Sequence, residues 1–268
     1  MTQFANAMAV FKLLPKTSCK KCNETTCLAF ASKVFLGQKK INQCPFIGSD
    51  IIDKYQSQPN KETLVEKQQQ AIIKKMKQKI AAYDLKDAAD RTGGVYADGR
   101  LTLRIMGKTF SIDHNGDLFS NIHINPWVVS NILRYVLTCK GVPLTQKWVS
   151  FRELEGGREQ NGLFVQTSEV PFKKIADRYI DFFEDLIVLF NGQRVEKLFD
   201  SDISLILSPL PKLPILICYW KPEEGMASDL HLFFDSSADQ NANISIVYGI
   251  AVGIVVMFEK ISITHGIG

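Results

Sequence analysis

The chain has 268 residues, of which 46% are apolar, and its formal net charge is +4. This length suffices for one large domain and a small one, and the composition is that of a globular protein with a sizeable core. The charge is uneven, because residues 1–91 hold 16 Lys and Arg against 8 Asp and Glu, whereas the remainder holds 16 against 20. Since the lysines are dispersed and lack interleaved aromatic side chains, we do not expect nucleic-acid binding.

The sequences near the two ends of the chain indicate where in the cell we expect the protein. The first residues lack the basic region and the apolar stretch of a secretory signal, so we expect a cytoplasmic protein with reduced thiols and no disulfides. The apolar run 244–258 is too short for a membrane span, which needs about 20 residues. We expect a buried helix there and no membrane span.

Apolar residues at helical spacing predict a first helix over residues 4–14. A second helix is predicted over residues 27–36, with Thr25 and Thr26 as capping residues and Gly37 as its stop. The face of this second helix expected to shield the cysteines near its start consists of Leu28, Ala31, Val34 and Phe35.

Two further helices are predicted before the middle of the chain. A short one covers residues 49–55, and a long one covers residues 62–83. The long helix has a narrow apolar face and many lysines, so we interpret it as a linker between two domains whose lysines form a solvated face.

Four of the six cysteines fall within 26 residues, in the spacing C-x2-C-x4-C-x16-C followed by a proline: Cys19, Cys22, Cys27 and Cys44. Cys27 lies in the first turn of the predicted second helix, where exposed amides and the helix dipole favour a thiolate over a thiol. Four metal-bound thiolates make a site anionic. The neighbouring lysines that would offset this charge are Lys12, Lys16, Lys20 and Lys21.

Three identities compete for this site: structural zinc, a 4Fe-4S cluster, or unrelated thiols. The close spacing argues against unrelated thiols. Zinc ribbons usually pair two C-x2-C knuckles, whereas here a helix-borne Cys27 and a distant Cys44-Pro45 replace the second pair. Cys-Pro closings recur in iron-sulfur ligation. The residues therefore favour a 4Fe-4S cluster, with structural zinc as the alternative.

From Val95 the apolar pattern changes to period two, and two tight turns predict a meander of short strands up to residue 119. Pro126 opens a predicted helix that ends near Cys139, and Pro171 opens a phenylalanine-rich helix to residue 190. A short strand at residues 148–154 and three later strands complete the pattern: 203–207, 215–220 and 230–235.

These elements predict an α+β protein, with a small helical iron-sulfur domain and a larger domain that has an antiparallel sheet packed by helices. We place the cluster domain at residues 1–59, a helical linker at 60–91 and the larger domain at 92–268.

The larger domain offers one candidate cofactor-binding stretch after its short aromatic strand: Arg152, Glu153, Gly156 and Gly157. The glycine pair would let backbone amides approach a ligand, and a plain turn with a surface ion pair is the alternative. Asp235, at the end of an apolar strand, is either a ligand or a strand cap. Cys139 and Cys218 lie in apolar contexts and are expected in the core. The sequence has no phosphate loop, dinucleotide fingerprint, nucleophile elbow or zinc-protease helix.

The stretches 14–22, 27–31 and Cys44-Pro45 resemble the small 4Fe-4S domain of the corrinoid iron-sulfur protein large subunit, also called the acetyl-CoA decarbonylase/synthase gamma subunit. A related cysteine arrangement occurs in an Rnf-type electron-transport subunit. The resemblance covers about residues 5–60 and implies that Cys19, Cys22, Cys27 and Cys44 are the ligands. Asn23 departs from the small residue usual after the second cysteine.

The remainder is similar to a family of proteins from anaerobes in which this iron-sulfur domain precedes a domain of unknown function. The stretches that carry this similarity are 107–113, 142–157 and 232–235. It implies an architecture but no activity, and the corrinoid-binding part of the gamma subunit is absent from the sequence.

Our leading hypothesis is a redox protein that passes single electrons through a 4Fe-4S cluster to a partner or to a cofactor held by the second domain. The resemblance implies corrinoid-linked one-carbon metabolism, with a corrinoid bound in cis or on a partner. That partner would be a corrinoid protein or a methyltransferase. The alternatives are a cofactor- or partner-binding module with a structural metal cluster, and an enzyme whose site lies around Arg152 and Glu153.

Overall fold

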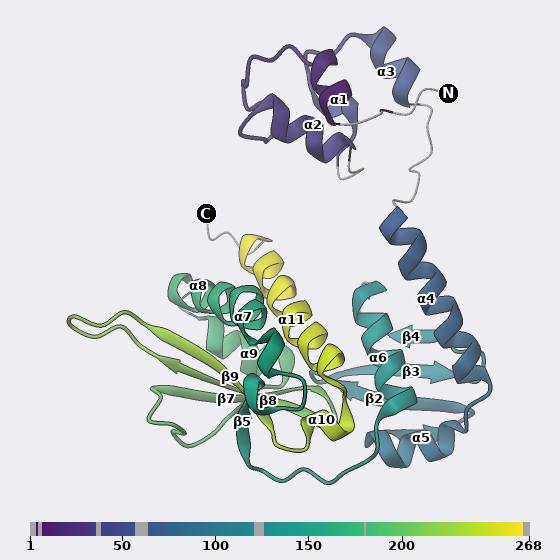
Figure 1. Ribbon diagram of the computed structural model, residues 1–268, viewed down its shortest axis with the longest axis vertical. Coiled ribbons are helices and arrows are strands. Elements are labelled where there is room, and N and C mark those ends of the chain that lie inside the picture. The colour runs from purple at the N-terminus through teal and green to yellow at the C-terminus, as the bar shows by residue number, and fades with distance from the viewer. Residues whose placement is uncertain are drawn as a thin grey trace. The chain divides into compact units, whose positions relative to one another are not determined.

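The computed structural model describes residues 4, 7–35, 39–56, 64–120, 126–179 and 181–264. The chain forms two compact units, Met1–Gln70 and Ala71–Gly268 (Figure 1). Each unit has its own apolar core. The first unit is helical, and the second combines helices with antiparallel sheets. The predicted α+β class is therefore confirmed.

The helices of the first unit are short, and Thr26 caps the second of them by accepting a hydrogen bond from Ala29 N at 3.0 Å. This cap agrees with the prediction, whereas Gly37 lies outside the described residues. Helices α1 and α2 pack against each other. The elements are α1 (Ala7–Leu13), α2 (Cys27–Phe35), the 3-10 helix η1 (Ile41–Gln43) and α3 (Ser49–Gln56).

The buried face of α2 differs from the predicted one. Leu28 and Phe35 are 44% and 45% exposed, whereas Cys27, Phe30 and Ala31 are buried. Together with the partly buried Val34, these residues follow the helical spacing i, i+3, i+4, i+7. The prediction was wrong at Leu28 and Phe35 because the thiol of Cys27 itself occupies the core and sets the rotation of the helix.

Helix α4 (Leu64–Ala81) contains the boundary between the units. Ile80 is fully buried in the core of the second unit, and Ile73 and Met76 pack against the same core. The next helix, α5 (Leu85–Thr92), also packs on this core and is capped by Asp84, whose carboxylate accepts from two backbone N–H groups. The predicted division at residues 59 and 91 stays a prediction.

The predicted meander is confirmed as a four-stranded antiparallel sheet in the order β1-β2-β3-β4. Its strands are β1 (Val95–Ala97), β2 (Arg100–Ile105), β3 (Lys108–Asp113) and β4 (Leu118–Ser120). Inward side chains alternate along β2 and β3, with Leu101 and Leu103 fully buried opposite Ile112 and Phe110. This alternation is the period-two pattern of the sequence.

The remaining strands form a second antiparallel sheet, in the order β5-β9-β8-β7-β6. They are β5 (Trp148–Ser150), β6 (Gln193–Arg194), β7 (Ile203–Leu210), β8 (Leu213–Trp220) and β9 (Asp229–Asp235). Met106 N donates to Ser208 O at 2.9 Å and joins the two sheets at the backbone.

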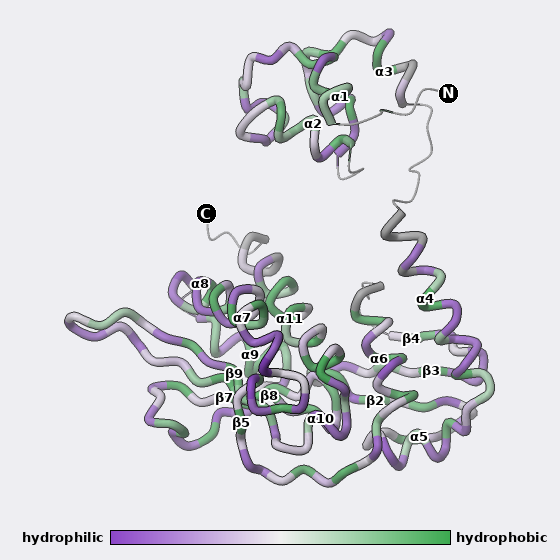
Figure 2. The backbone as a smooth tube through the Cα atoms, viewed as in Figure 1, coloured by the Kyte–Doolittle hydropathy of each residue, from purple (hydrophilic) through white to green (hydrophobic). Residues whose placement is uncertain are grey.

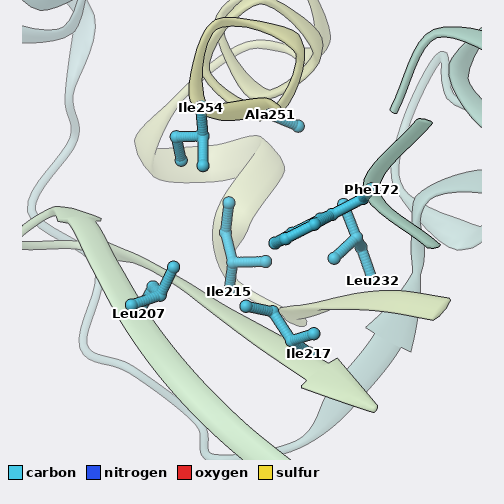
Figure 3. Close-up of a pocket in the computed structure, with 7 residues that line it drawn as sticks. All are labelled: Phe172, Leu207, Ile215, Ile217, Leu232, Ala251 and Ile254. Atoms are coloured by element: carbon cyan, nitrogen blue, oxygen red, sulfur yellow. The ribbon is translucent and has the colours of Figure 1, made fainter. Parts of the chain in front are cut away.

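Helices cover one face of the second sheet (Figure 1). Figure 3 shows two residues of α11 above side chains from β7, β8 and β9, with Phe172 of α8 beside these side chains. They enclose an apolar cavity of about 10 Å³ whose lining is Phe172, Leu207, Ile215, Ile217, Leu232, Ala251 and Ile254. A buried water needs two to four polar partners, and this lining offers none. The cavity is therefore a packing gap.

The helices that follow β5 along the chain are η2 (Phe151–Glu153), η3 (Arg158–Gln160), α7 (Asn161–Phe164), the π-helix η4 (Val165–Glu169), α8 (Val170–Arg178), α9 (Phe182–Phe190), α10 (Ala238–Asn241) and α11 (Ile244–Thr264). Helix α6 (Pro126–Thr138) follows the first sheet, as predicted. The single helix predicted from Pro171 to residue 190 is wrong. Helical structure begins before Pro171, and Tyr179 takes an extended conformation that separates α8 from α9.

Helix α11 contains the apolar run near the C-terminus, which Figure 2 colours as hydrophobic. Its buried side chains recur at helical spacing and face the core: Ile246, Val247, Ile250, Ala251, Ile254, Val255 and Phe258. The prediction of a buried helix is confirmed. Over the described part of the chain, no helix has the length and apolarity that crossing a membrane requires.

Candidate metal centre

All four clustered cysteines are free thiols. Cys27 begins α2 and Cys44 follows η1; both are buried in the core of the first unit, against which Cys22 also packs. Burial raises the pKa of Cys44, and the nearby Cys22, Cys27 and Cys19 raise it further because a second negative charge is unfavourable there. The fold thus brings the four thiols into one electrostatic environment.

Backbone N–H groups point at three of these sulfurs. Ser18 N donates to Cys27 Sγ at 3.3 Å. A hydrogen bond from the Lys21 amide lowers the pKa of Cys19, and one from the Phe46 amide counteracts the effect of burial on the pKa of Cys44. Amide hydrogen bonds favour the thiolate form of cysteine and are among the interactions that set the potential of iron-sulfur clusters.

The loop that leads to α2 has an unusual backbone. Four of its non-glycine residues have a positive φ: Lys16 (59°), Ser18 (47°), Lys20 (61°) and Asn23 (56°). Such conformations cost free energy and gather where a backbone must wrap a functional group. Asn is one of the side chains that tolerates this region, which explains how Asn23 replaces the small residue usual at this turn.

A buried carboxylate, which the sequence reasoning missed, braces the loop. Glu24 is 9% exposed and forms ion pairs with Lys33 Nζ of α2 at 2.9 Å and with Lys39 Nζ at 2.8 Å. Lys39 Nζ also donates to the carbonyl oxygen of Cys22 at 2.7 Å. We call these three residues the Glu24 clamp. The sequence signal for it was an isolated acidic residue between two ligand candidates in a basic segment.

The four lysines expected to offset the charge of the site are all exposed: Lys12, Lys16, Lys20 and Lys21. Two of them lie over aromatic rings, Lys16 at 5.7 Å from the centroid of Phe11 and Lys21 at 5.0 Å from that of Phe46. These cation–π contacts therefore hold the charged ends of the two lysines against the protein surface.

Clustered thiolates bind two kinds of metal group, a zinc ion or an iron-sulfur cluster. Within the described ranges, the side chains of His, Cys, Asp and Glu form no group of three or more that could hold a metal ion. The chemistry of the donor set fits an iron-sulfur cluster, because thiolates are the ligands of such clusters and three of the four thiols, Cys22, Cys27 and Cys44, lie at one core.

The candidate residues of the second unit lie in a closed turn. Glu153 Oε2 accepts hydrogen bonds from Ser150 N at 2.8 Å and from Ser150 Oγ at 2.6 Å, which forms a capping box. Gly157 N donates to Leu154 O at 2.9 Å, and a Cβ at Gly157 would lie 1.9 Å from Phe151 O. These contacts show that Glu153 and Gly157 each help to form the turn. A ligand site at Arg152, Glu153, Gly156 and Gly157 stays a prediction.

Asp235 is a strand cap. Its buried carboxylate accepts from the backbone N–H groups of Thr145, Gln146 and Ser237 at 2.7 to 3.1 Å, and from the hydroxyls of Thr145 and Ser237. Burial of the carboxylate raises the pKa of Asp235, but these hydrogen bonds outweigh burial and lower the pKa below its ordinary value. Cys139 and Cys218 lie in the core, as predicted.

The first unit therefore has the thiols, the amides and the burial of an iron-sulfur site. Residues 14–46 match the family described as "Putative Fe-S cluster", which supports the class of iron-sulfur proteins. Residues 84–257 match the family described as "Domain of unknown function (DUF3786)", and the chain belongs to this family.

Two curated relatives are similar to the N-terminal part of the chain. The acetyl-CoA decarbonylase/synthase complex subunit gamma of Methanocaldococcus jannaschii is 39% identical over 66 residues, which are 25% of this chain and 12% of the relative. The subunit of the same name from Methanothermobacter thermautotrophicus is 48% identical over 44 residues, 16% of this chain and 10% of the relative. The chain thus spans about a tenth of the length of these relatives. No solved structure matches it.

Proposed function

We propose that the protein transfers single electrons through one 4Fe-4S cluster held by Cys19, Cys22, Cys27 and Cys44. The observation that carries this proposal is the grouping of Cys22, Cys27 and Cys44 at one core, together with backbone hydrogen bonds to the clustered sulfurs such as that from Ser18 N to Cys27 Sγ. These hydrogen bonds stabilise the negative charge that a redox cluster bears. The similarity of residues 14–46 to an iron-sulfur family supports the same assignment.

Different groups of residues have different roles at this site. The four thiolates would hold the cluster, which supplies one-electron chemistry when it is bound. The Ser18, Lys21 and Phe46 amides stabilise charge on the sulfurs, and the apolar side chains around Cys27 and Cys44 exclude water. The Glu24 clamp fixes the carbonyl of Cys22 and with it the C-x2-C loop.

The metabolic setting is part of the proposal and rests on similarity alone. Two relatives of the first unit are gamma subunits of a decarbonylase/synthase complex. We therefore assign the protein to corrinoid-linked one-carbon metabolism in the cytoplasm of an anaerobe, with a corrinoid protein or a methyltransferase as the redox partner.

The proposal is tested by anaerobic reconstitution of the full chain. We expect about four irons and four sulfides per chain, a broad visible absorption, and a paramagnetic signal on one-electron reduction. Cys27→Ser is expected to lower the iron content and to abolish the reduced-state signal. Cys218→Ala, which removes a core thiol of the second unit, is the matched control and should retain both. A chain that binds one zinc instead, or a Cys27→Ser variant with an unchanged cluster, would contradict the proposal.

A further inference from the structure

The four cysteines are not equally buried. Cys27 and Cys44 are 6% and 4% exposed, whereas Cys19 and Cys22 are only partly buried. Electron transfer between proteins slows steeply with distance, so a partner gains most by docking where the sulfurs approach the surface. The loop that carries Cys19 and Cys22 is that place.

The surface beside these two cysteines has the composition of a docking site. Lys20 and Lys21 lie between Cys19 and Cys22 in the loop, and Lys21 Nζ lies over the ring of Phe46, which is 51% exposed. Phe46 and the exposed Pro45 follow Cys44 directly. An exposed aromatic ring with charged neighbours matches the apolar centre and polar rim of protein interfaces. We call Lys20, Lys21, Pro45 and Phe46 the docking face.

The charge of the first unit indicates the kind of partner. Residues 1–70 contain ten lysines and no arginine against five acidic residues. Glu24 is already engaged by Lys33 and Lys39, whereas Lys20 and Lys21 are exposed. Nucleic-acid binding surfaces favour arginine, whose planar group pairs with phosphates and bases. A basic segment whose cationic side chains are all lysines suits electrostatic steering of a protein that carries negative charge.

We infer that the docking face binds an acidic electron-carrier protein, which exchanges one electron with the cluster over the Cys19–Cys22 loop. This inference rests on the proposed function. In the step, the reduced carrier loses one electron and the cluster gains it, and no bond is made or broken. Lysines steer the carrier into contact, and the ring of Phe46 packs at the centre of the encounter.

The test uses the full chain with a reconstituted cluster and a reduced, small acidic ferredoxin as the probe, mixed in a stopped-flow instrument. The test variant is Lys20→Glu/Lys21→Glu. The control is Lys86→Glu/Lys108→Glu, which makes the same charge change at two exposed positions of the second unit. Lys20→Gln/Lys21→Gln serves as a second test variant if the charge reversal impairs cluster assembly. A zwitterionic sulfonated viologen radical is the small reductant that needs no docking.

We expect the ferredoxin rate constant of the wild type to fall with added salt, because screening weakens steering. At low salt, Lys20→Glu/Lys21→Glu should be slower by about tenfold or more, the Gln pair should lie between, and the control should match the wild type. The viologen rate should be equal in all chains. Equal effects of the test and control pairs, a rate independent of salt, or preferential binding of duplex DNA over ferredoxin would overturn the inference. Loss of viologen reduction in the wild type would instead overturn the proposed redox function itself.

Discussion

At the scale of single residues, the charged groups around the cysteines decide how the loop is held. The Glu24 clamp connects the C-x2-C loop to α2 and to the segment before η1 through ion pairs of 2.8 and 2.9 Å. Its third contact, from Lys39 Nζ to the carbonyl of Cys22, acts on the backbone of a proposed ligand. Outer groups of this kind orient metal ligands, and their mutation typically lowers metal affinity by about 10- to 100-fold.

We predict that Glu24→Gln loses iron to a chelator faster than the wild type, by about 10-fold or more, because neutralising the buried carboxylate frees Lys33 and Lys39. The release is followed by the colour of the iron-chelator complex under anaerobic conditions. Asp50→Asn, an equal charge change at an exposed position of α3, is the control and should release iron at the wild-type rate. Equal rates for Glu24→Gln and the wild type would show that the clamp does not position Cys22.

At the scale of elements, the edge of β9 illustrates how the second sheet is closed. Strand β5 pairs with only three residues of β9, Phe233 to Asp235, so the first part of β9 has an edge that β5 leaves open. Glu169 of the π-helix η4 covers this edge by accepting from Leu232 N at 2.9 Å. A carboxylate at such a position satisfies the backbone donor and discourages pairing with another chain.

The ion pairs of His231 make the stability of this edge depend on pH. Its Nδ1 lies 3.4 Å from Glu169 Oε2, and its Nε2 lies 3.2 Å from Asp229 Oδ2. The hydrogen bond with Glu169 raises the pKa of His231 above its ordinary 6.5, Asp229 adds to the effect, and burial opposes it. Because the pKa of His231 is higher in the folded state, its ion pairs stabilise the folded protein fully below pH 6.5. This stabilisation is lost as the pH rises through the higher pKa of the folded state.

We therefore predict that His231→Gln lowers the free energy of unfolding of the second unit more at about pH 5.5 than at about pH 8.5. Urea unfolding at both pH values, with the wild type beside the variant, measures this difference. His114→Gln, at an exposed turn position, is the control and should show no such trend. A difference that is constant with pH, or larger at the alkaline value, would contradict the ion pairs of His231.

At the scale of the whole molecule, the two units have separate cores. Among the described residues of the first unit, the core contains eight buried apolar residues, and two of them are cysteines: Val10, Leu14, Cys27, Phe30, Ala31, Ile41, Cys44 and Ile47. A core this small supplies little stability, so a bound metal group is expected to contribute much of it. The core of the second unit is several times larger and contains none of the four clustered cysteines.

We predict that removing the metal with an anaerobic chelator unfolds the first unit and leaves the second folded. Hydrogen exchange read by mass spectrometry should rise in residues 7–35 and 39–56, while β2, β3 and β8 stay protected. Cys27→Ser should show the same pattern without a chelator. Equal loss of protection in both units would indicate that they unfold together, and unchanged exchange in the first unit would show that its core suffices without metal.

The sequence by itself determined the features that depend on local patterns. Period-two alternation predicted the meander, helical spacing predicted α1, Pro126 predicted the start of α6, and the long apolar run predicted α11. That the four clustered cysteines bind a metal group stays a prediction. The helix α5 was missed because it is short and polar, and the break at Tyr179 was missed because the apolar pattern continues across it.

Only the tertiary structure decided what the partners of each side chain are. It rotated α2 so that Cys27 faces the core, placed Glu24 between Lys33 and Lys39, and turned Glu153 and Gly157 into parts of a closed turn. The physical reason is that spacing fixes which residues share a face of one element, whereas burial and ion pairing depend on which elements pack together. The four cysteines are close in sequence, but their burial and their amide partners come from the fold.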